Sequence, residues 1–444
     1  MPHQTSYQKY GGWLPTSHEI HRSFVEKHLK VAVLRGGPTA HIAAVEEFKN
    51  AIKNDATMKD LFDQIFLQVS AINTVPNFET LLSMLDTILQ SGPPFHVVRD
   101  SEGKVTGEPI GVPIYLIFDL LSNTAAAYDL FRLPCFNAAM KKLLDSWGSF
   151  LSDPERDSNA VLNTGPEGWF GQTGVITMEE KIHPLKFNDT YAIPDPNADN
   201  RGFTTWDAFF TRQLKEGARP VHFPDKKSLI HSACESTVYR VARNVKAHDQ
   251  FWLKSRKYSL YDMLDRDEEN AAYFAGGTVY QAYLHAPDYH RWHTPIDGTI
   301  EKYEMIDGSY FAGIPDEGAP ADDPNFPEGS PHAALIRSQS YLTINATRAL
   351  IYIKADNPDI GRICFIGVGM TEVSTCDVTV KEGQHVSTGD ELGMFHFGGS
   401  SHALIFESKC QITFADVIQE GNHIWVNSII GRVGSRLLAE KCRL

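Results

Sequence analysis

The stretch VTVKEGQHVSTGDELG (residues 378–393), followed directly by MFHFGGSS (394–401), decides the fold of this chain. In its first part, the pattern V-x-x-G-x-x-V-x-x-G-D-x-L is typical of a flattened β-sandwich with tight turns at the glycines. In its second part, two glycines precede Ser400, and glycine allows backbone conformations that bring a hydroxyl close to the preceding carbonyl. The stretch therefore predicts a β-rich fold, whereas GGSS taken alone is most often only a turn.

The same spacing of valine and glycine occurs in biotin- and lipoyl-carrier domains, so a carrier function is one alternative. A carrier needs a lysine on an exposed hairpin tip between the paired halves of the sandwich. No lysine with the expected flanking residues occurs there. We therefore expect a barrel-sandwich-like element and doubt the carrier function.

The rest of the C-terminal half has the same β-rich character. Short segments of β-branched and aromatic residues alternate with turn signals such as Asp297-Gly298 and Asp307-Gly308. An amphipathic helix over Thr205–Leu214 is expected to precede the strands. The segments expected to form strands include Thr278–Leu284, Thr299–Tyr303, Ala349–Ile353 and Arg362–Val368.

The N-terminal part has the 3.6-residue periodicity of helices instead. One apolar stripe ends at Gly92-Pro93-Pro94, and a second lies further along the chain. Residues 41–70 and 115–133 are also expected to be helical, the latter up to Pro134. The two stripes consist of Phe78, Leu81, Leu82, Leu85 and Leu89, and of Met140, Leu143, Leu144, Trp147 and Leu151. Such stripes are typical of packing faces, and nothing in residues 1–170 indicates chemistry.

Between residues 153 and 202 the composition changes to Asp, Asn, Gly and Pro, as it does in loops and linkers. We therefore predict an α+β protein with three parts. These are a helical N-terminal domain (1–170), a linker (171–202) and a β-rich domain (203–444).

The composition argues against several classes of function. The chain has 41 Lys and Arg against 55 Asp and Glu, a net charge of −14, which argues against a nucleic-acid binder and against docking on anionic lipid. Residues 1–15 lack the apolar core of a signal peptide, and the longest apolar stretches are far shorter than a membrane span. The six scattered cysteines, without a C-x-x-C pair, favour a reduced, cytoplasmic protein.

An acidic, proline-rich stretch, PDEGAPADDPNFPEGSP (315–331), interrupts the β-rich half. Its Asp316, Asp322 and Asp323 are possible calcium ligands. Because they lack the tight register of a calcium-binding loop, we expect a solvated surface loop instead.

Two further segments carry residues suited to proton transfer. In APDYHRWHTP (286–295), His290 and His293 are three residues apart, and histidine exchanges a proton near neutral pH. H-x-x-H is also half of a metal motif, but no partner ligands follow at zinc-like spacing, so no metal is predicted. In LIHSACES (229–236), Glu235 is an acid among apolar and small residues, which suits it to orient a histidine. Taken alone, each residue is equally compatible with a structural role.

Taken together and in this order, these pieces resemble the phosphatidylserine decarboxylase family over about residues 203–444. The matching segments are FTTWDAFFTRQLKEGARP (203–220), KYSL (257–260), DYHRWHTP (288–295), GVGMT (367–371) and GDELGMFHFGGSS (389–401). The whole chain is most similar to a fungal branch of the family that decarboxylates L-tryptophan. It departs from the phospholipid enzymes in two respects: Glu235 stands where they have an aspartate, and no membrane anchor or basic surface is visible.

The resemblance implies a cofactor that the chain makes from itself. The peptide bond between Gly399 and Ser400 is expected to break, and Ser400 is expected to become a pyruvoyl group, so that no external cofactor is needed. The fragments 1–399 and 400–444 are then expected to remain associated without a covalent link.

The resemblance also implies roles for the polar residues. His293 is expected to be the base for the Ser400 hydroxyl, with Glu235 fixing its tautomer. His290 is expected to protonate the substrate carbon. The sequence leaves open which of the two histidines has which role. His402 is either a further site residue or only part of a strand face.

By the same resemblance, the expected reaction converts L-tryptophan to tryptamine and carbon dioxide. Trp292, Phe395 and Phe397 lie beside the chemistry in sequence and, with His402, are candidates for the substrate pocket. The alternatives are phosphatidylserine as the substrate, and a binding or scaffold protein without activity. The acidic charge and missing anchor count against the lipid, and the intact serine and histidine pair counts against a scaffold.

Overall fold

The structure is a computed structural model of the chain. The predicted cleavage residue Gly399 and its neighbour Gly398 lie outside the described part, as do parts of the acidic loop. The described residues are 18–34, 40–99, 101–249, 258–311, 313, 316–323, 326–372, 375–397 and 400–434.

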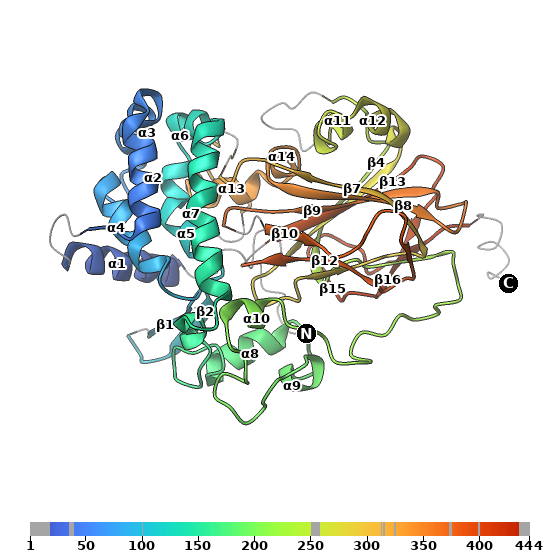
Figure 1. Ribbon diagram of the computed structural model, residues 1–444, viewed down its shortest axis with the longest axis horizontal. Coiled ribbons are helices and arrows are strands. Elements are labelled where there is room, and N and C mark those ends of the chain that lie inside the picture. Colours follow the sequence, from blue (N-terminus) through green and yellow to red (C-terminus); the bar gives the residue numbers. More distant parts are fainter. Residues whose placement is uncertain are drawn as a thin grey trace.

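A layer of helices forms one side of the molecule (Figure 1). Its members are α1 (His18–Leu34), α2 (Ala43–Asn54), α3 (Ala56–Gln68), α4 (Phe78–Ile88), α5 (Pro113–Ser122), α6 (Ala125–Leu130) and α7 (Pro134–Ser152). The two predicted apolar stripes lie on α4 and α7, and their residues are largely buried. Helices over these two segments are therefore confirmed. Among the described residues, no helix has the length and apolar composition of a membrane span.

The helical layer differs from the prediction at three places. The expected helix over 41–70 is two helices, because the Asp55 side chain accepts hydrogen bonds from backbone N–H groups of α3 and caps a new helix start. The expected helix over 115–133 is likewise divided, with Thr124 capping α6. A hairpin of β1 (Phe95–Arg99) and β2 (Val105–Pro109), which periodicity did not predict, packs beside α1 and α8.

Short helices connect this layer to the sheets. They are η2 (Asp157–Val161), α8 (Gln172–Glu180), α9 (Phe187–Thr190) and α10 (Trp206–Phe210). The predicted linker thus contains α8 and α9. The helix predicted over 205–214 ends early, since Leu214 pairs with Tyr191 in a β-bridge. The exact domain boundaries stay a prediction.

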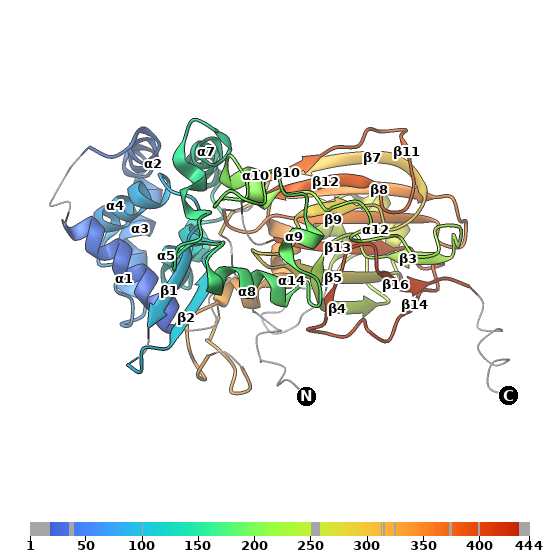
Figure 2. The same ribbon diagram turned by 90° about the horizontal axis from the view of Figure 1, so that it is seen from below.

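The C-terminal half is built on an eight-stranded antiparallel sheet (Figure 2). Its order is β11 (His385–Val386), β7 (Gly298–Ile306), β8 (Arg348–Ala355), β9 (Arg362–Val368), β13 (Ser400–Phe406), β5 (Thr278–Leu284), β4 (Ser236–Arg243) and β15 (His423–Ile424). Two three-stranded sheets accompany it. They consist of β10 (Thr375–Val378), β12 (Glu391–His396) and β6 (Arg291–His293), and of β14 (Thr413–Phe414), β16 (Ile429–Arg432) and β3 (Leu229–His231).

Four short helices complete the described chain, namely α11 (Leu260–Met263), α12 (Glu268–Phe274), α13 (Ala334–Arg337) and α14 (Gln339–Asn345). The fold is therefore α+β, with helices first and sheets after them, as predicted. The described strands do not close into a barrel, because the end strands β11 and β15 each have one neighbour in the large sheet.

Strand β13 lies in the middle of the large sheet. It pairs with β5 on one side and with β9 on the other, and all seven of its residues are buried. A strand covered on both faces is expected to be apolar throughout, and β13 is apolar from Ala403 to Phe406. Its first three residues, Ser400, Ser401 and His402, are polar exceptions to this rule.

The helical layer contacts the sheets through positions without room for a side chain. A Cβ atom on Gly148 of α7 would lie 2.8 Å from the Phe397 ring, and one on Gly111 would lie 2.1 Å from the Ala286 Cβ. Glycine at both positions therefore permits close approach. Phe397 precedes the glycine pair before Ser400, so the helices pack directly against this corner of the chain.

A buried carboxyl group joins the same two parts. The Glu372 carboxylate accepts backbone hydrogen bonds from Ile114, at 2.7 Å, and from Tyr115, at the first turn of α5. An acid at a helix N-terminus is favourable electrostatically. Burial nevertheless raises the pKa of Glu372 to about 7.

This raised pKa predicts a pH-dependent stability. Between pH 4.5, the ordinary pKa of the group, and about 7, the folded chain holds a proton on Glu372 that the unfolded chain has released. The contribution of Glu372 to the free energy of unfolding should therefore fall as the pH rises through this interval, by up to about 1.4 kcal/mol per pH unit. Buried histidines with lowered pKa values act in the opposite sense, so the contribution is read from a difference. In urea unfolding at pH 5, 6, 7 and 8, the free energy of unfolding of the wild type minus that of Glu372→Gln should fall with this slope.

Glu26→Gln, at an exposed position on α1, is the matched control and should keep the wild-type slope. Parallel curves for the wild type and Glu372→Gln would show that the carboxyl is ionised in the folded chain.

Candidate active site

Ser400 begins β13 directly after the glycine pair. It lies opposite Leu284 of β5 and is fully buried. Its Oγ atom has no hydrogen-bond partner among the described residues. A buried hydroxyl without a partner is energetically unfavourable, so such a group points to a function rather than to stability.

His402 lies two residues further along β13 and therefore on the same face of the sheet as Ser400. Its ring packs beside Tyr280 and Phe365, and neither ring nitrogen has a hydrogen-bond partner in the described structure. Burial lowers the pKa of His402 to about 3. The imidazole is therefore neutral at pH 7.

His290 lies where β12 leads into the corner before Ser400. Its backbone carbonyl accepts a hydrogen bond from Phe395 near the end of β12. Its ring stacks on Phe210 with centroids 3.9 Å apart, and Nε2 lies 3.2 Å from the Ala286 carbonyl oxygen. Nδ1 is buried without a partner among the described residues, and burial lowers the pKa to about 3. His290 thus offers a neutral nitrogen at this end of the sheet.

His293 lies at the opposite end of β12. It pairs with Glu391, the first residue of that strand, which is about 16 Å from its last residue at 3.3 Å per residue. Both ring nitrogens are occupied: Nδ1 lies 2.7 Å from the Gly389 carbonyl oxygen and Nε2 lies 2.9 Å from the Tyr289 hydroxyl. Burial lowers the pKa of His293 as well. The register therefore brings His290, rather than His293, to the end of β12 that leads to Ser400.

The expected contact between Glu235 and His293 is not formed. Both carboxylate oxygens of Glu235 accept hydrogen bonds from the Arg219 guanidinium, at 2.8 Å each. Arg219 in turn lies 4.1 Å from the Trp425 ring centroid and is as deeply buried as the acid. A planar guanidinium matches a carboxylate with two parallel bonds, so it outcompetes an imidazole for this acid. The prediction that Glu235 fixes the tautomer of His293 is therefore wrong in this structure.

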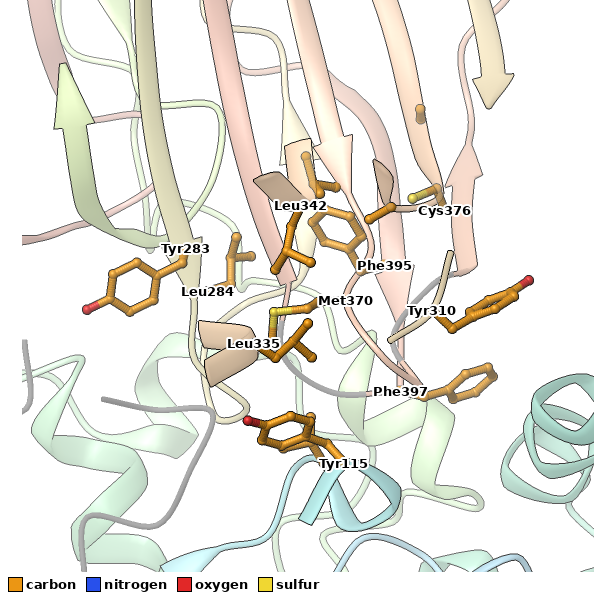
Figure 3. Packing of buried hydrophobic residues seen from close by; sticks show 14 of the residues in the cluster. Tyr115, Tyr283, Leu284, Tyr310, Leu335, Leu342, Met370, Cys376, Phe395 and Phe397 are labelled. Atoms are coloured by element: carbon orange, nitrogen blue, oxygen red, sulfur yellow. The ribbon is translucent and has the colours of Figure 1, made fainter. Parts of the chain in front are cut away.

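The predicted pocket residues lie in the packed interior beside the corner. Trp292 and Phe395 are fully buried, with ring centroids 4.6 Å apart, and Trp292 also packs on Phe365. Phe397 is nearly buried and contacts α7 through Gly148. Figure 3 shows Phe395 and Phe397 close to the loop that carries Met370. Their role in substrate binding stays a prediction.

Sequence reasoning missed several neighbours of this corner. Figure 3 shows that Leu284, Leu335 and Met370 gather there, with Tyr115 of the helical layer below them. Met370 belongs to the GVGMT segment, which resembles the family motif, but its partners come from distant parts of the chain. No local sequence signal marks such contacts.

Two residues of this region have a backbone conformation that is unusual for their side chains. Phe397, directly before the glycine pair, has a φ of 80°, and Thr371, which follows Met370, has a φ of 54°. Positive φ is uncommon for residues other than glycine and is unfavourable for branched or aromatic side chains. Such conformations concentrate at functional sites, where the surrounding structure enforces them.

Comparisons with known proteins show the family to which the chain belongs. The family model for phosphatidylserine decarboxylase matches residues 206–432, and a second model of the same description matches residues 42–178. The first alone covers more than half of the chain. This chain belongs to the phosphatidylserine decarboxylase family.

Individual relatives refine the position of this decarboxylase within the family. "Decarboxylase iboD" of Amanita muscaria is 53% identical over 79% of the chain and 99% of the relative. An L-tryptophan decarboxylase of Psilocybe cubensis is 32% identical over 94% of the chain and 93% of the relative. Phosphatidylserine decarboxylase proenzyme 3 of Schizosaccharomyces pombe is 31% identical, but over only 46% of the chain and 19% of the relative. The chain is therefore a carboxy-lyase of this family, as predicted.

The buried Arg219–Glu235 pair leads to a test of stability. Arg219→Met leaves an ionised carboxylate buried without its partner and should lower the free energy of unfolding by about 3–5 kcal/mol. The double variant Arg219→Met with Glu235→Leu removes both charges and should recover much of this loss. Denaturant unfolding of the three proteins measures both effects.

Lys59→Met is the control, since Lys59 and Asp63 form an exposed pair at 3.0 Å. It should cost less than about 1 kcal/mol. An equally small effect of Arg219→Met would mean that the buried pair does not form as described.

Proposed function

We propose that this decarboxylase is pyruvoyl-dependent, that it makes the group from Ser400 by cleaving itself, and that its substrate is a free aromatic L-amino acid, with L-tryptophan the first choice. The observation that carries the proposal is the buried, unpartnered Ser400 Oγ directly after the glycine pair. An orphaned hydroxyl at this position of the family motif supports a chemical role for Ser400.

The self-cleavage uses only atoms of the chain and water. The Ser400 Oγ adds to the Gly399 carbonyl carbon and displaces the Ser400 nitrogen, which turns the amide into an ester. A base then removes the Ser400 α-proton, the Cβ–Oγ bond breaks, and Gly399 leaves as a carboxylate. The remaining dehydroalanine takes up water and releases ammonia, which leaves a ketone at position 400.

The surroundings of Ser400 suit such a group. Ser400 is fully buried with Leu284 opposite, so the methyl group of a pyruvoyl residue fits where the hydroxymethyl group was. Strand β13 pairs with two neighbours and is buried throughout. These contacts support the proposal that fragment 400–444 stays attached to fragment 1–399 after cleavage.

The pyruvoyl group would act as the electron sink when carbon dioxide leaves. The chain's own part is to exclude water and to move protons. Buried, neutral imidazoles are suited to accept a proton from Ser400 or to return one to the substrate carbon, and His290 has the favourable position and a free Nδ1. An apolar site also favours loss of a carboxylate's charge, because ionised groups are poorly solvated there.

The helical layer supports an amino-acid substrate. The relatives described as L-tryptophan decarboxylases match nearly the whole chain, whereas the phosphatidylserine decarboxylase of S. pombe matches less than half of it. Residues 111–115 and α7 of this layer contact Ala286, Glu372 and Phe397, next to the proposed site. The part of the chain shared with the amino-acid decarboxylases therefore borders the site.

Cleavage and activity test the proposal together. The intact mass of the purified chain should show two fragments of 399 and 45 residues, the smaller with a pyruvoyl end. Ser400→Ala should remain one chain and release no tryptamine from L-tryptophan. An unmodified serine at position 400 in active protein would contradict the proposed cofactor.

Substrate choice is measured on the same preparation. Release of carbon dioxide is compared for the twenty common L-amino acids and for phosphatidylserine in vesicles. Activity on the lipid alone would identify a phosphatidylserine decarboxylase. Self-cleavage without activity on any of these substrates would contradict the proposed substrate but not the proposed cofactor.

The two histidines are distinguished by the rate of self-cleavage. His290→Ala should slow it by about a hundredfold or more, because this ring lies at the corner, whereas His293→Ala should slow it less. Gel analysis after synthesis measures the rate, and unfolding curves confirm that both variants fold. The reverse order would restore His293 as the base.

A further inference from the structure

Three residues that no local motif connects meet at the end of β4, β5 and β15. His285 and Asp288 come from the turn after β5, and His423 comes from β15. One ligand atom from each lies within 4.8 Å of the other two. We propose that His285, Asp288 and His423 form a buried binding site for one divalent transition-metal ion of the zinc class.

The cluster contains polar atoms that the protein itself does not satisfy. The Asp288 side chain is fully buried and its Oδ1 has no hydrogen-bond partner in the described chain; the same holds for the His423 Nε2. These two atoms face each other at 3.8 Å. A shared proton would bring them to about 2.7–2.9 Å. Two ligands of one tetrahedral zinc ion lie about 3.3–3.5 Å apart, so an ion fits the observed gap with a small shift.

Neighbouring groups hold the three side chains in place. The Thr237 hydroxyl lies 3.2 Å from the His423 Nδ1 and 2.9 Å from the His285 Nε2. The Asp288 Oδ2 accepts a hydrogen bond of 2.7 Å from the His285 backbone N–H. Such contacts typically fix the tautomer and the direction of a metal-binding side chain.

A second cluster, formed by His21, Asp119 and His332, differs because its carboxylate already has hydrogen-bond partners within the protein. Asp119 accepts hydrogen bonds from the Tyr115 hydroxyl and the Ala333 N–H, and lies 2.8 Å from the His332 Nδ1. The His21 Nε2 lies 3.2 Å from a backbone carbonyl. The carboxylate oxygens of that cluster are already used within the protein.

The donor set selects the class of ion. Two imidazole nitrogens and one carboxylate oxygen suit zinc, cobalt or nickel, whereas magnesium and calcium prefer oxygen ligands alone. Lys181 acts electrostatically on all three residues and is a cation with which the ion must compete. The His423 side chain is 16% exposed, which provides an entry path.

The cluster lies on the other face of the sheet from Ser400. His423 pairs with Thr237, Thr237 pairs with Tyr283, and Tyr283 is the neighbour of Leu284, which faces Ser400. Because successive residues of a strand point to opposite faces, an ion in the cluster would not contact Ser400. It would hold the turn between His285 and Asp288, whose Ala286 carbonyl oxygen lies 3.2 Å from the His290 Nε2.

This position gives the ion a second consequence, which rests on the proposed self-cleavage. After cleavage, His423 belongs to fragment 400–444, whereas His285 and Asp288 belong to fragment 1–399. One ion would thus join the two fragments through metal–ligand bonds where the peptide bond has been lost.

Cobalt binding to the full-length, chelator-treated protein tests the site directly. Titration with Co²⁺ should give a visible absorption band that saturates at about one equivalent and disappears when Zn²⁺ is added. X-ray absorption of the wild-type cobalt protein should show two imidazole ligands. His423→Ala should lose the band, whereas His385→Ala, at an exposed histidine paired with Asp356, should keep it.

Absence of the band in the wild type, a band of equal strength in His423→Ala, or a spectrum without two imidazoles would each overturn the proposal. The X-ray absorption measurement holds even if His423→Ala fails to fold, because it uses the wild type alone.

Comparison with uncut Ser400→Ala separates this site from the proposed function. Ser400→Ala should bind one Co²⁺ as the wild type does. Removing the ion should lower the thermal midpoint more in the cleaved wild type than in Ser400→Ala, because only there does it release a fragment. If the wild type binds the metal but never cleaves, the metal site is retained and the self-cleavage is rejected. If removing the ion lowers the thermal midpoint equally in the cleaved wild type and in uncut Ser400→Ala, the bridging role is rejected.

Discussion

The pairing of β13 with a neighbour on each side is the constraint on which the rest of this structure depends. It buries Ser400, Ser401 and His402 in the middle of an antiparallel sheet, where water cannot satisfy them. An apolar strand at this place would be more stable, so the polar residues cost free energy that the apolar run from Ala403 onward offsets. The strand thus combines an apolar run that holds it in the sheet with three buried polar residues at its start.

Burial also determines how the histidines of this half behave. His290 and His402 have their pKa values lowered to about 3 because desolvation disfavours the imidazolium. Both rings are therefore neutral at pH 7, and each accepts a proton only from a group that becomes strongly acidic during the reaction. Glu235 has a different environment, since both of its carboxylate oxygens accept hydrogen bonds from the Arg219 guanidinium. Among the described residues, neither His290 nor His402 has a hydrogen bond to a carboxylate.

Much of the fold could be predicted because periodic patterns report local structure. The stripes of α4 and α7 and the strands around β5, β7, β8 and β9 all follow from the spacing of apolar residues. Side-chain partners could not be predicted, because they depend on tertiary contacts. Arg219 meets Glu235 from a turn 16 residues away, and Asp288 meets His423 across more than a hundred residues. The helix breaks at Asp55 and Thr124 could not be predicted from periodicity, because in each case the side chain caps a new helix although the apolar spacing continues.

The two glycines at the contact between helices and sheets have an evolutionary consequence. Glycine inside α7 lowers helix stability by about 1 kcal/mol relative to alanine, yet no larger residue fits at Gly148 without moving Phe397. An added methyl group at Gly148 would displace Phe397, and one at Gly111 would displace Ala286. At these two positions the helical layer therefore accepts no larger side chain unless Phe397 or Ala286 moves with it.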